Sequence, residues 1–203
     1  DFCLSRGLGD VYKRQIYTEA NISYDRTFGH HNVNGMVLYN MRNRMIATAG
    51  SAIASIPYRN QAIAARFGYG YKERYLAEVN GSYTGSENFA PGHRFGFFPS
   101  FSAGWRINQE SFMQDASWID NLKLRASWGQ LGNINNVGQY DYFATYVQGG
   151  NYNFENTIVS GIREGKPANP GLGWETVTIT NVGVDFDILN GLFSFTGEFY
   201  DKQ

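Results

Sequence analysis

The residues that could carry chemistry are few, and their spacing builds no catalytic or metal site. His30, His31 and His93 lack a metal-ligand spacing such as HExxH, and His30 and His31 fall at a short turn, where solvation is the simpler role. Gly68 and Gly70 lie within a strand pattern that no helix follows, which argues against a phosphate-binding loop. We therefore predict that the chain is not an enzyme and holds no metal and no cofactor.

In the segments expected to form β-strands, polar and apolar residues alternate, so that each strand would have one polar face and one apolar face. Carboxylates and cations at such positions could line an aqueous lumen and hydrogen-bond around its wall. The predicted lumen-facing wall consists of Glu78, Asn80, Lys123, Arg125, Asn181 and Asp185. The other face, which would be the convex side of a curved sheet, is expected to carry Ile63, Ala65, Phe67, Val79, Leu124, Ala126, Val184 and Phe195.

A long segment, residues 132–173, combines aromatic side chains with several Asn and Gln residues. Aromatic faces and amide hydrogen bonds together suit sugar rings, so this segment is a candidate ligand-binding loop. The alternative, that its tyrosines pack the loop or contact a partner protein, stays open. The candidate ligand-binding residues are Tyr140, Tyr142, Tyr146 and Tyr152.

The amino-acid composition predicts the class of secondary structure that must position these residues. The chain has 203 residues, of which 42% are hydrophobic, 17% charged and 16% aromatic, with 24 glycines. This profile excludes a disordered tail and a helical bundle and favours an all-β protein. The balance of 17 basic and 18 acidic residues gives no reason to expect a nucleic-acid partner. The mean hydropathy of -0.39 is compatible with a transmembrane β-barrel, because its lipid-facing and lumen-facing residues alternate.

Period-2 alternation predicts eight strands, and most are longer than the about 5–6 residues usual in soluble sheets. Short and long connections alternate between them, as they do in outer-membrane barrels. An aromatic core in a soluble β-sandwich is the alternative that this pattern leaves open. The strands are expected near residues 16–28, 31–40, 58–71, 74–86, 95–107, 121–131, 174–187 and 192–203, with residues 132–173 as a long outer loop.

The first 15 residues are expected to lie outside the fold. Residues 2–15, FCLSRGLGDVYKRQ, resemble the adapter or assembly scar found at the ends of metagenome-derived reading frames, so residues 1–15 are interpreted as an artefactual leader. Cys3 lies within it, and the chain from residue 16 onward contains no cysteine for a disulfide or thiol site. A basic amphipathic leader is the rival interpretation, which Gly7, Gly9 and Asp10 disfavour.

Four ordered motifs resemble one protein family over residues 16–203. They include YRN before RYL, FFPSFSAGWR, LKLRASWGQLGN and NPGLGWE, within residues 55–89, 95–113, 118–133 and 169–202. Together they resemble the barrel of the SusC/RagA family of TonB-dependent outer-membrane transporters. The order of all four motifs at plausible spacing is more specific than any one of them.

This resemblance implies a barrel of about 22 strands in the outer membrane, with a plug domain inside it. It further implies TonB-ExbB-ExbD as the source of energy, a SusD-like surface lipoprotein as the partner, outer-membrane lipid around the wall, and a glycan or peptide as the substrate. Because the chain carries no plug, TonB box or signal peptide, we expect an interior fragment from the C-terminal half of the barrel. The expected fold is all-β: a partial, open, antiparallel up-and-down transmembrane β-barrel of about eight strands.

The alternative function is a non-transport β protein, either a small anchoring or adhesive barrel or a soluble carbohydrate-binding sandwich. The coding region around the gene separates these two classes. A plug domain encoded upstream and a SusD-like gene downstream would identify the importer.

Overall fold

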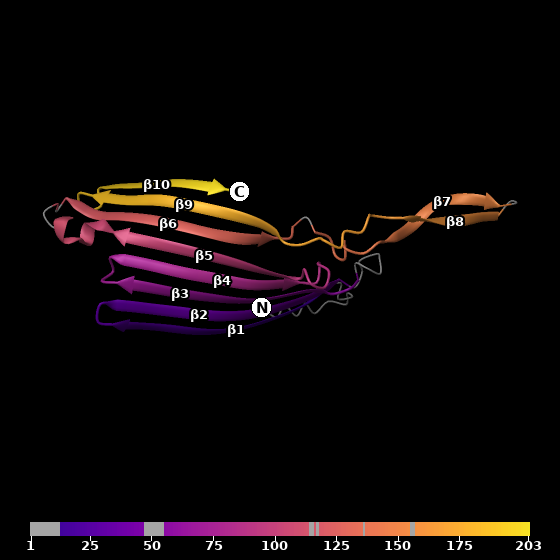
Figure 1. Ribbon diagram of the computed structural model, residues 1–203, viewed down its shortest axis with the longest axis horizontal. Helices are drawn as coiled ribbons and strands as arrows, with labels where there is room; N and C mark the ends of the chain where they lie inside the picture. Colours follow the sequence, from indigo (N-terminus) through magenta and orange to yellow (C-terminus); the bar gives the residue numbers. More distant parts are fainter. Residues whose placement is uncertain (1–12, 47–54, 114–115, 117, 136, 155–156) are drawn as a thin grey trace, which may run out of the picture.

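The chain folds into one long antiparallel sheet, beyond which a two-stranded hairpin projects (Figure 1). The computed structural model describes residues 13–46, 55–113, 116, 118–135, 137–154 and 157–203. The sheet contains β1 (Lys13–Phe28), β2 (His31–Ile46), β3 (Tyr58–Tyr71), β4 (Tyr75–Ser86), β5 (Phe95–Arg106), β6 (Ile119–Asn133), β9 (Glu175–Ile188) and β10 (Phe193–Lys202), and the hairpin contains β7 (Tyr146–Phe154) and β8 (Thr157–Glu164). Among the described residues, no helix has the length and apolar character needed to span a membrane.

The strands of the large sheet lie side by side in chain order, β1-β2-β3-β4-β5-β6-β9-β10, and every neighbouring pair is antiparallel. The predicted open up-and-down sheet of eight strands is confirmed. A soluble sandwich would need a second sheet packed on the first, whereas the other sheet in the described residues is the β7–β8 hairpin. β1 and β10 form the two edges, so the sheet does not close into a small barrel within the described part of the chain.

Several strand bounds differ from the predicted ones. β1 begins at Lys13, inside the segment set aside as a leader, while residues 1–12 lie outside the described residues. β2 continues to Ile46 rather than ending near residue 40. Both extensions have one cause: the ladder between β1 and β2 runs in register to the pair of Lys13 and Ile46, although the alternation of side chains weakens beyond Asn40.

The connections differ at the two ends of the sheet. At one end lie a two-residue turn with Gly29 at φ 60°, the turn of residues 72–74, and residues 107–118 with the short 3-10 helices η1 (Ile107–Gln109) and η2 (Ser111–Met113). At the other end, residues 87–94 join β4 to β5, and the segment that contains the hairpin joins β6 to β9. Within residues 132–173, predicted as a long outer loop, residues 146–154 and 157–164 pair as strands β7 and β8.

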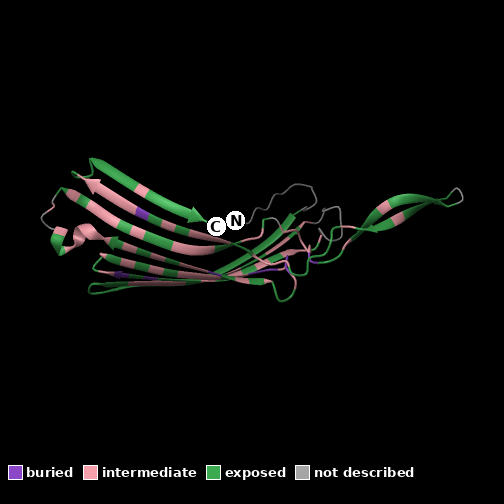
Figure 2. Ribbon diagram, turned by 45° about the horizontal axis from the view of Figure 1, so that its top comes forward, coloured by how far each residue is buried: buried purple, intermediate pink, exposed green. Residues whose placement is uncertain are grey.

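The two faces of the sheet have opposite character. Paired residues in a ladder project to the same face, so the register extends each row of side chains across the sheet. One such row joins Phe67, Val79, Phe101 and Trp128, and the row beside it joins Gly68, Glu78, Ser102 and Ser127. On the apolar face, Phe67 is 53% exposed and Ile22 is 78% exposed. Figure 2 shows exposed residues along the strands of the large sheet. A single sheet that leaves such side chains uncovered requires an apolar environment against that face.

We expect the isolated chain to aggregate rather than to form a stable monomer. Among the described residues, β1 and β10 are edge strands that each present a row of unpaired backbone groups, and the apolar face adds exposed aromatic area. Expression of residues 13–203 alone, followed by gel filtration in mild detergent, checks this expectation. A monodisperse monomer with cooperative unfolding would contradict it.

Candidate lumen wall and loop cluster

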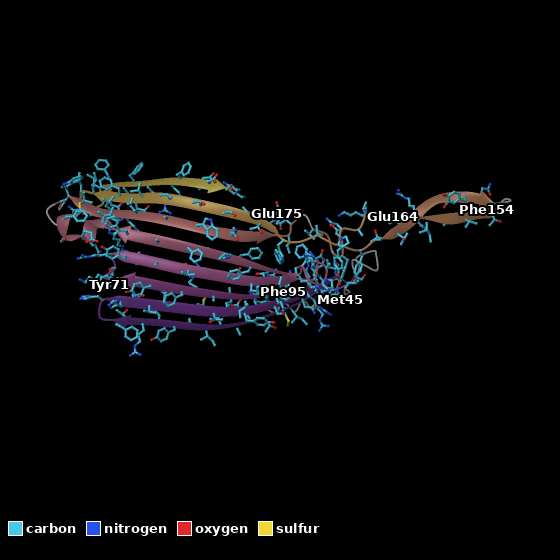
Figure 3. The ribbon with its side chains drawn as sticks, viewed as in Figure 1. Met45, Tyr71, Phe95, Phe154, Glu164 and Glu175 are labelled. Carbon is cyan, nitrogen blue, oxygen red and sulfur yellow. The ribbon has the colours of Figure 1, made fainter. Side chains whose placement is uncertain are left out.

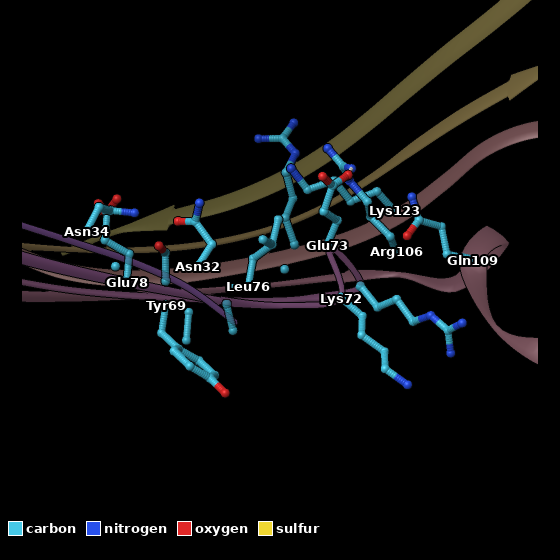
Figure 4. Close-up of a pocket in the computed structure, with 18 of the residues that line it drawn as sticks. Asn32, Asn34, Tyr69, Lys72, Glu73, Leu76, Glu78, Arg106, Gln109 and Lys123 are labelled. Atoms are coloured by element: carbon cyan, nitrogen blue, oxygen red, sulfur yellow. Dashed lines mark ion pairs between the residues drawn. The ribbon is translucent and has the colours of Figure 1, made fainter. Parts of the chain in front are cut away.

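A hollow of about 1340 Å³ lies on the polar face of the sheet, toward the end with the short turns (Figure 4). Asn32, Asn34 and Glu78 point to the hollow side, whereas Tyr69 points away from it (Figure 4). Of the six residues predicted for the polar wall, four line this hollow: Glu78, Lys123, Arg125 and Asn181. The alternation along β4 and β9 places the other two, Asn80 and Asp185, on the same face. The structure therefore brings the predicted wall residues together on one face.

Arg125 on β6 makes two ion pairs within this wall. Its Nε lies 3.4 Å from Oδ2 of Asp185, and its Nη1 lies 3.4 Å from Oε1 of Glu198 on β10. The Nδ2 of Asn181 also donates to Oε1 of Glu198. One arginine thus links β6 to two carboxylates on β9 and β10, so the fixed charges of the wall are largely neutralised within it.

Gly183 gives Arg125 the room to cross β9. The register aligns Arg125 with Gly183 and Gly183 with Glu198, so the guanidinium must pass over residue 183 to reach β10. A Cβ at residue 183 would lie 2.8 Å from Nε of Arg125 and 3.0 Å from its Cζ. A side chain at this position must therefore push the guanidinium aside.

We expect Gly183→Ala in the longer protein to uncouple Arg125 from Glu198. A double-mutant cycle of Arg125→Met and Glu198→Gln should give a coupling of about 0.5–1 kcal/mol in the native background, since both groups are more than a third exposed and solvent screens them. The coupling should fall toward zero in Gly183→Ala. The control is Gly129→Ala, where a Cβ would meet Ser100 rather than an ion pair. Equal couplings in all three backgrounds would contradict the role given to Gly183.

A second polar network occupies β3 and β4. The Nε of Arg66 donates to Oδ1 of Asn80 at 3.1 Å and lies 3.7 Å from Oε1 of Glu78, while Nδ2 of Asn80 donates to the same Glu78 oxygen at 2.8 Å. Here too a glycine supplies clearance, because a Cβ on Gly68 would lie 2.4 Å from the side chain of Asn34. Small residues thus let polar side chains lie flat along the wall and leave the hollow open.

The turn between β5 and β6 is held against the sheet by Glu110. Its Oε1 accepts from the Tyr75 hydroxyl at 2.6 Å and from Nε1 of Trp105 at 3.1 Å, and its Oε2 lies 3.4 Å from Nη1 of Arg74. The hydrogen bonds from Tyr75 and Trp105, with the charge of Arg74, lower the pKa of Glu110 below its ordinary value. Tyr75 and Trp105 stack with ring centroids 6.5 Å apart, as part of an aromatic row at this end of the sheet.

At the opposite end, residues far apart in sequence pack into a small core, here called the loop cluster, which consists of Phe89, Phe98 and Trp174. Phe89 is fully buried, and Trp174 lies with its ring centroid 5.2 Å from that of Phe89 and 5.3 Å from that of Phe98. The Nε1 of Trp174 donates to the carbonyl of Arg94 at 3.1 Å. The loop cluster therefore fixes the segment before β9 onto β5 and the β4–β5 connection.

Asp141 joins the two segments that lead into and out of the hairpin, residues 137–145 and 165–173, here called the base. Its Oδ2 accepts from Nζ of Lys166 at 2.6 Å and from the backbone N–H of Gly138 at 2.9 Å. The Lys166 hydrogen bond is the main cause of the lowered pKa of Asp141. Gln139 adds a hydrogen bond of 2.8 Å to the carbonyl of Ile56, which links this base to the β2–β3 connection. The base is thus an ordered part of the fold.

The four candidate tyrosines lie in two places. Tyr142 is buried at the base, next to Tyr140 with ring centroids 5.9 Å apart. Tyr146 and Tyr152 lie on the projecting hairpin and are 73% and 61% exposed. Figure 3 shows Phe154 and Glu164 on this hairpin, away from the sheet. The four side chains do not form one site, and the burial of Tyr142 agrees with the packing role that the sequence left open.

Some contacts of the wall and of the loop cluster cannot be expected from the sequence alone. Phe89 and Trp174 come from segments about 85 residues apart in a loop-like context, and only the fold brings them together. Gly183 and Glu198 were not paired with Arg125, although the register of β6, β9 and β10 does so. Within the residues that the structure describes, no group of three or more His, Cys, Asp and Glu could hold a metal ion.

An open antiparallel up-and-down sheet with one hollow polar face and one apolar face is typical of part of the wall of a transmembrane β-barrel. No protein-family model matches the chain. Among curated proteins, TonB-dependent receptor P26 of Formosa agariphila is 33% identical over 159 residues, which cover 74% of this chain and 15% of that protein. TonB-dependent receptor SusC of Bacteroides thetaiotaomicron is 37% identical over 129 residues, which cover 62% of this chain and 13% of that protein.

Solved structures give the same fold. The RagAB peptide importer in its closed-closed state matches with a TM-score of 0.72 at 20% identity, over 94% of this chain and 24% of that chain. Its open-open state matches with a TM-score of 0.73, also at 20% identity, over 94% of this chain and 23% of that chain. The chain belongs to the TonB-dependent receptor family of the SusC/RagA type. It spans about a seventh of the length of these curated relatives, whose names denote receptors rather than enzymes, as predicted.

Proposed function

We propose that residues 16–203 form part of the barrel wall of an outer-membrane, TonB-dependent importer of oligosaccharides or peptides. The observation that carries this proposal is the division of one eight-stranded sheet into a hollow polar face and an exposed apolar face. In this role the polar wall faces the lumen, and the apolar face contacts outer-membrane lipid. The similarity to SusC and to the RagAB fold supports the same assignment.

The other parts of the proposed importer belong to the longer protein and to its partner proteins. TonB-ExbB-ExbD would supply energy through a plug domain outside this chain, and a SusD-like lipoprotein would act with the loops at the long-connection end. Tyr146 and Tyr152, exposed on the hairpin, are the two candidate tyrosines available to touch a ligand or that lipoprotein. Tyr140 packs beside the buried Tyr142 in the base of the hairpin.

Growth of a strain that lacks the longer protein tests this function. We expect the strain to lose growth on one oligosaccharide or peptide source and to keep growth on the monomers, because oligomers above the porin limit need active import. The complementing protein should fractionate with the outer membrane and migrate differently on gels before and after boiling. Growth on every oligomer without the protein, or its absence from the outer membrane, would contradict the proposal.

A further inference from the structure

The apolar face contains a groove where one cross-strand row carries small side chains. The register aligns Ala65 with Gly81 and Gly81 with Pro99, and these three residues, here called the small-residue row, form the floor. The row on one side carries Ile63, Tyr83 and Phe97, and the row on the other side carries Phe67, Val79 and Phe101. The groove has a volume of about 450 Å³ and continues to Ile22 and Val37 on β1 and β2.

The lining offers almost no hydrogen-bonding group. Arg66 and Asn80 border the groove, but their side chains are engaged with each other on the opposite face, where Nε of Arg66 donates to Oδ1 of Asn80. Tyr24 is the one described lining residue whose side chain carries a polar atom on this face. The ring of Phe97 leans over Gly81, since a Cβ there would lie 3.2 Å from it. An occupant must therefore be apolar along its length.

We propose that this groove holds a single acyl chain of an outer-membrane lipid in a fixed position. The inference rests on the proposed function, because it needs the apolar face to lie in the membrane. A peptide segment does not fit, since its amide groups would enter the groove without partners, at a cost of several kcal/mol for each group. A hydrocarbon chain has no such groups and gains contact with the small-residue row and with Phe67, Phe97 and Phe101 beside it.

Lipid retention by the longer protein, purified from outer membranes in mild detergent, tests the groove. We expect native mass spectrometry to show a retained lipid that Gly81→Leu reduces about tenfold, the loss that follows when contact with about two methylene groups is removed. Gly197→Leu is the matched control. A Cβ on Gly197 would also lie 3.2 Å from a phenylalanine ring, that of Phe195, but on β10 and away from the groove. Equal retention by the native protein and Gly81→Leu would overturn the proposal.

A photoreactive side chain identifies the occupant directly. Benzoylphenylalanine in place of Val79, on the groove wall, should form an adduct with the mass of a lipid. An adduct with the mass of a protein would overturn the assignment. If Gly81→Leu does not assemble, as judged by its migration on gels before and after boiling, Ala65→Leu fills the same floor from β3. If the native protein supports no uptake or is not found in the outer membrane, the proposed function itself is contradicted. If it supports uptake but retains no lipid, only the proposal of a bound acyl chain is overturned.

Discussion

Deletion of the β7–β8 hairpin, residues 146–164, from the longer protein is expected to weaken ligand or partner binding by at least about tenfold, or about 1.4 kcal/mol. The hairpin carries Tyr146, Tyr152 and Phe154 in largely exposed positions, and its two strands pair only with each other within the described residues. A two-stranded sheet alone is marginal in water, so exposed aromatic side chains on it need a function or a covering surface. The barrel should still assemble, because the ladders of the large sheet do not include β7 or β8.

The choice of deletion end points decides whether this experiment can be interpreted. Deletion of residues 133–170 would also remove the hydrogen bond between Asp141 and Lys166 and the buried side chain of Tyr142. Deletion of residues 146–164 leaves that base in place. Growth on a single glycan or peptide source, with migration on unboiled gels as the assembly control, measures the effect. Unchanged growth and unchanged binding of the lipoprotein would refute the role of the hairpin while leaving the barrel assignment intact.

Phe89→Ala is expected to release the loop cluster at a cost of about 3–5 kcal/mol of local stability. Phe89 is fully buried and packs against Trp174, so the truncation leaves a cavity where the β4–β5 connection meets the segment before β9. Hydrogen exchange in residues 87–94 and 166–174 should accelerate, because these segments lose their shared contact. Exchange in the centres of β3 and β4 should stay slow.

Phe112→Ala is the matched control for this substitution. Phe112 lies in η2 at the opposite end of the sheet and is 66% exposed, so its truncation removes little buried area. We expect no change in exchange at the long-connection end. Protection of residues 166–174 that survives Phe89→Ala would show that other contacts hold the loop cluster.

The sequence was sufficient for those parts of the fold that depend on local alternation. Each strand of the large sheet has one apolar and one polar parity over most of its length, so both the number of strands and the shared face of Glu78 and Arg125 could be predicted. The Lys72-Glu73 turn and the alternation of short and long connections then favoured the up-and-down order.

Features that depend on register or on distant contacts could not be predicted in this way. The paired strands β7 and β8 contain glycines and a register shift between Gln148 and Asn151, which break the period-2 pattern. The room that Gly183 makes for Arg125 requires the alignment of three strands. The four candidate tyrosines look alike in sequence, and only the fold separates the buried Tyr142 from the exposed Tyr146 and Tyr152.

The most direct test of the account is whether adjacent residues of β5 face lipid and lumen in turn. In the longer protein, reconstituted in a bilayer with bromine-labelled lipid chains, a fluorescent probe is attached to cysteine in Phe101→Cys or in Ser102→Cys. Phe101 shares its row with Val79 and Trp128, and Ser102 shares its row with Glu78 and Ser127. We expect strong quenching of the probe at residue 101 and weak quenching at residue 102. Equal quenching at both positions, or stronger quenching at residue 102, would contradict the assignment of this sheet to a barrel wall with its polar face inward.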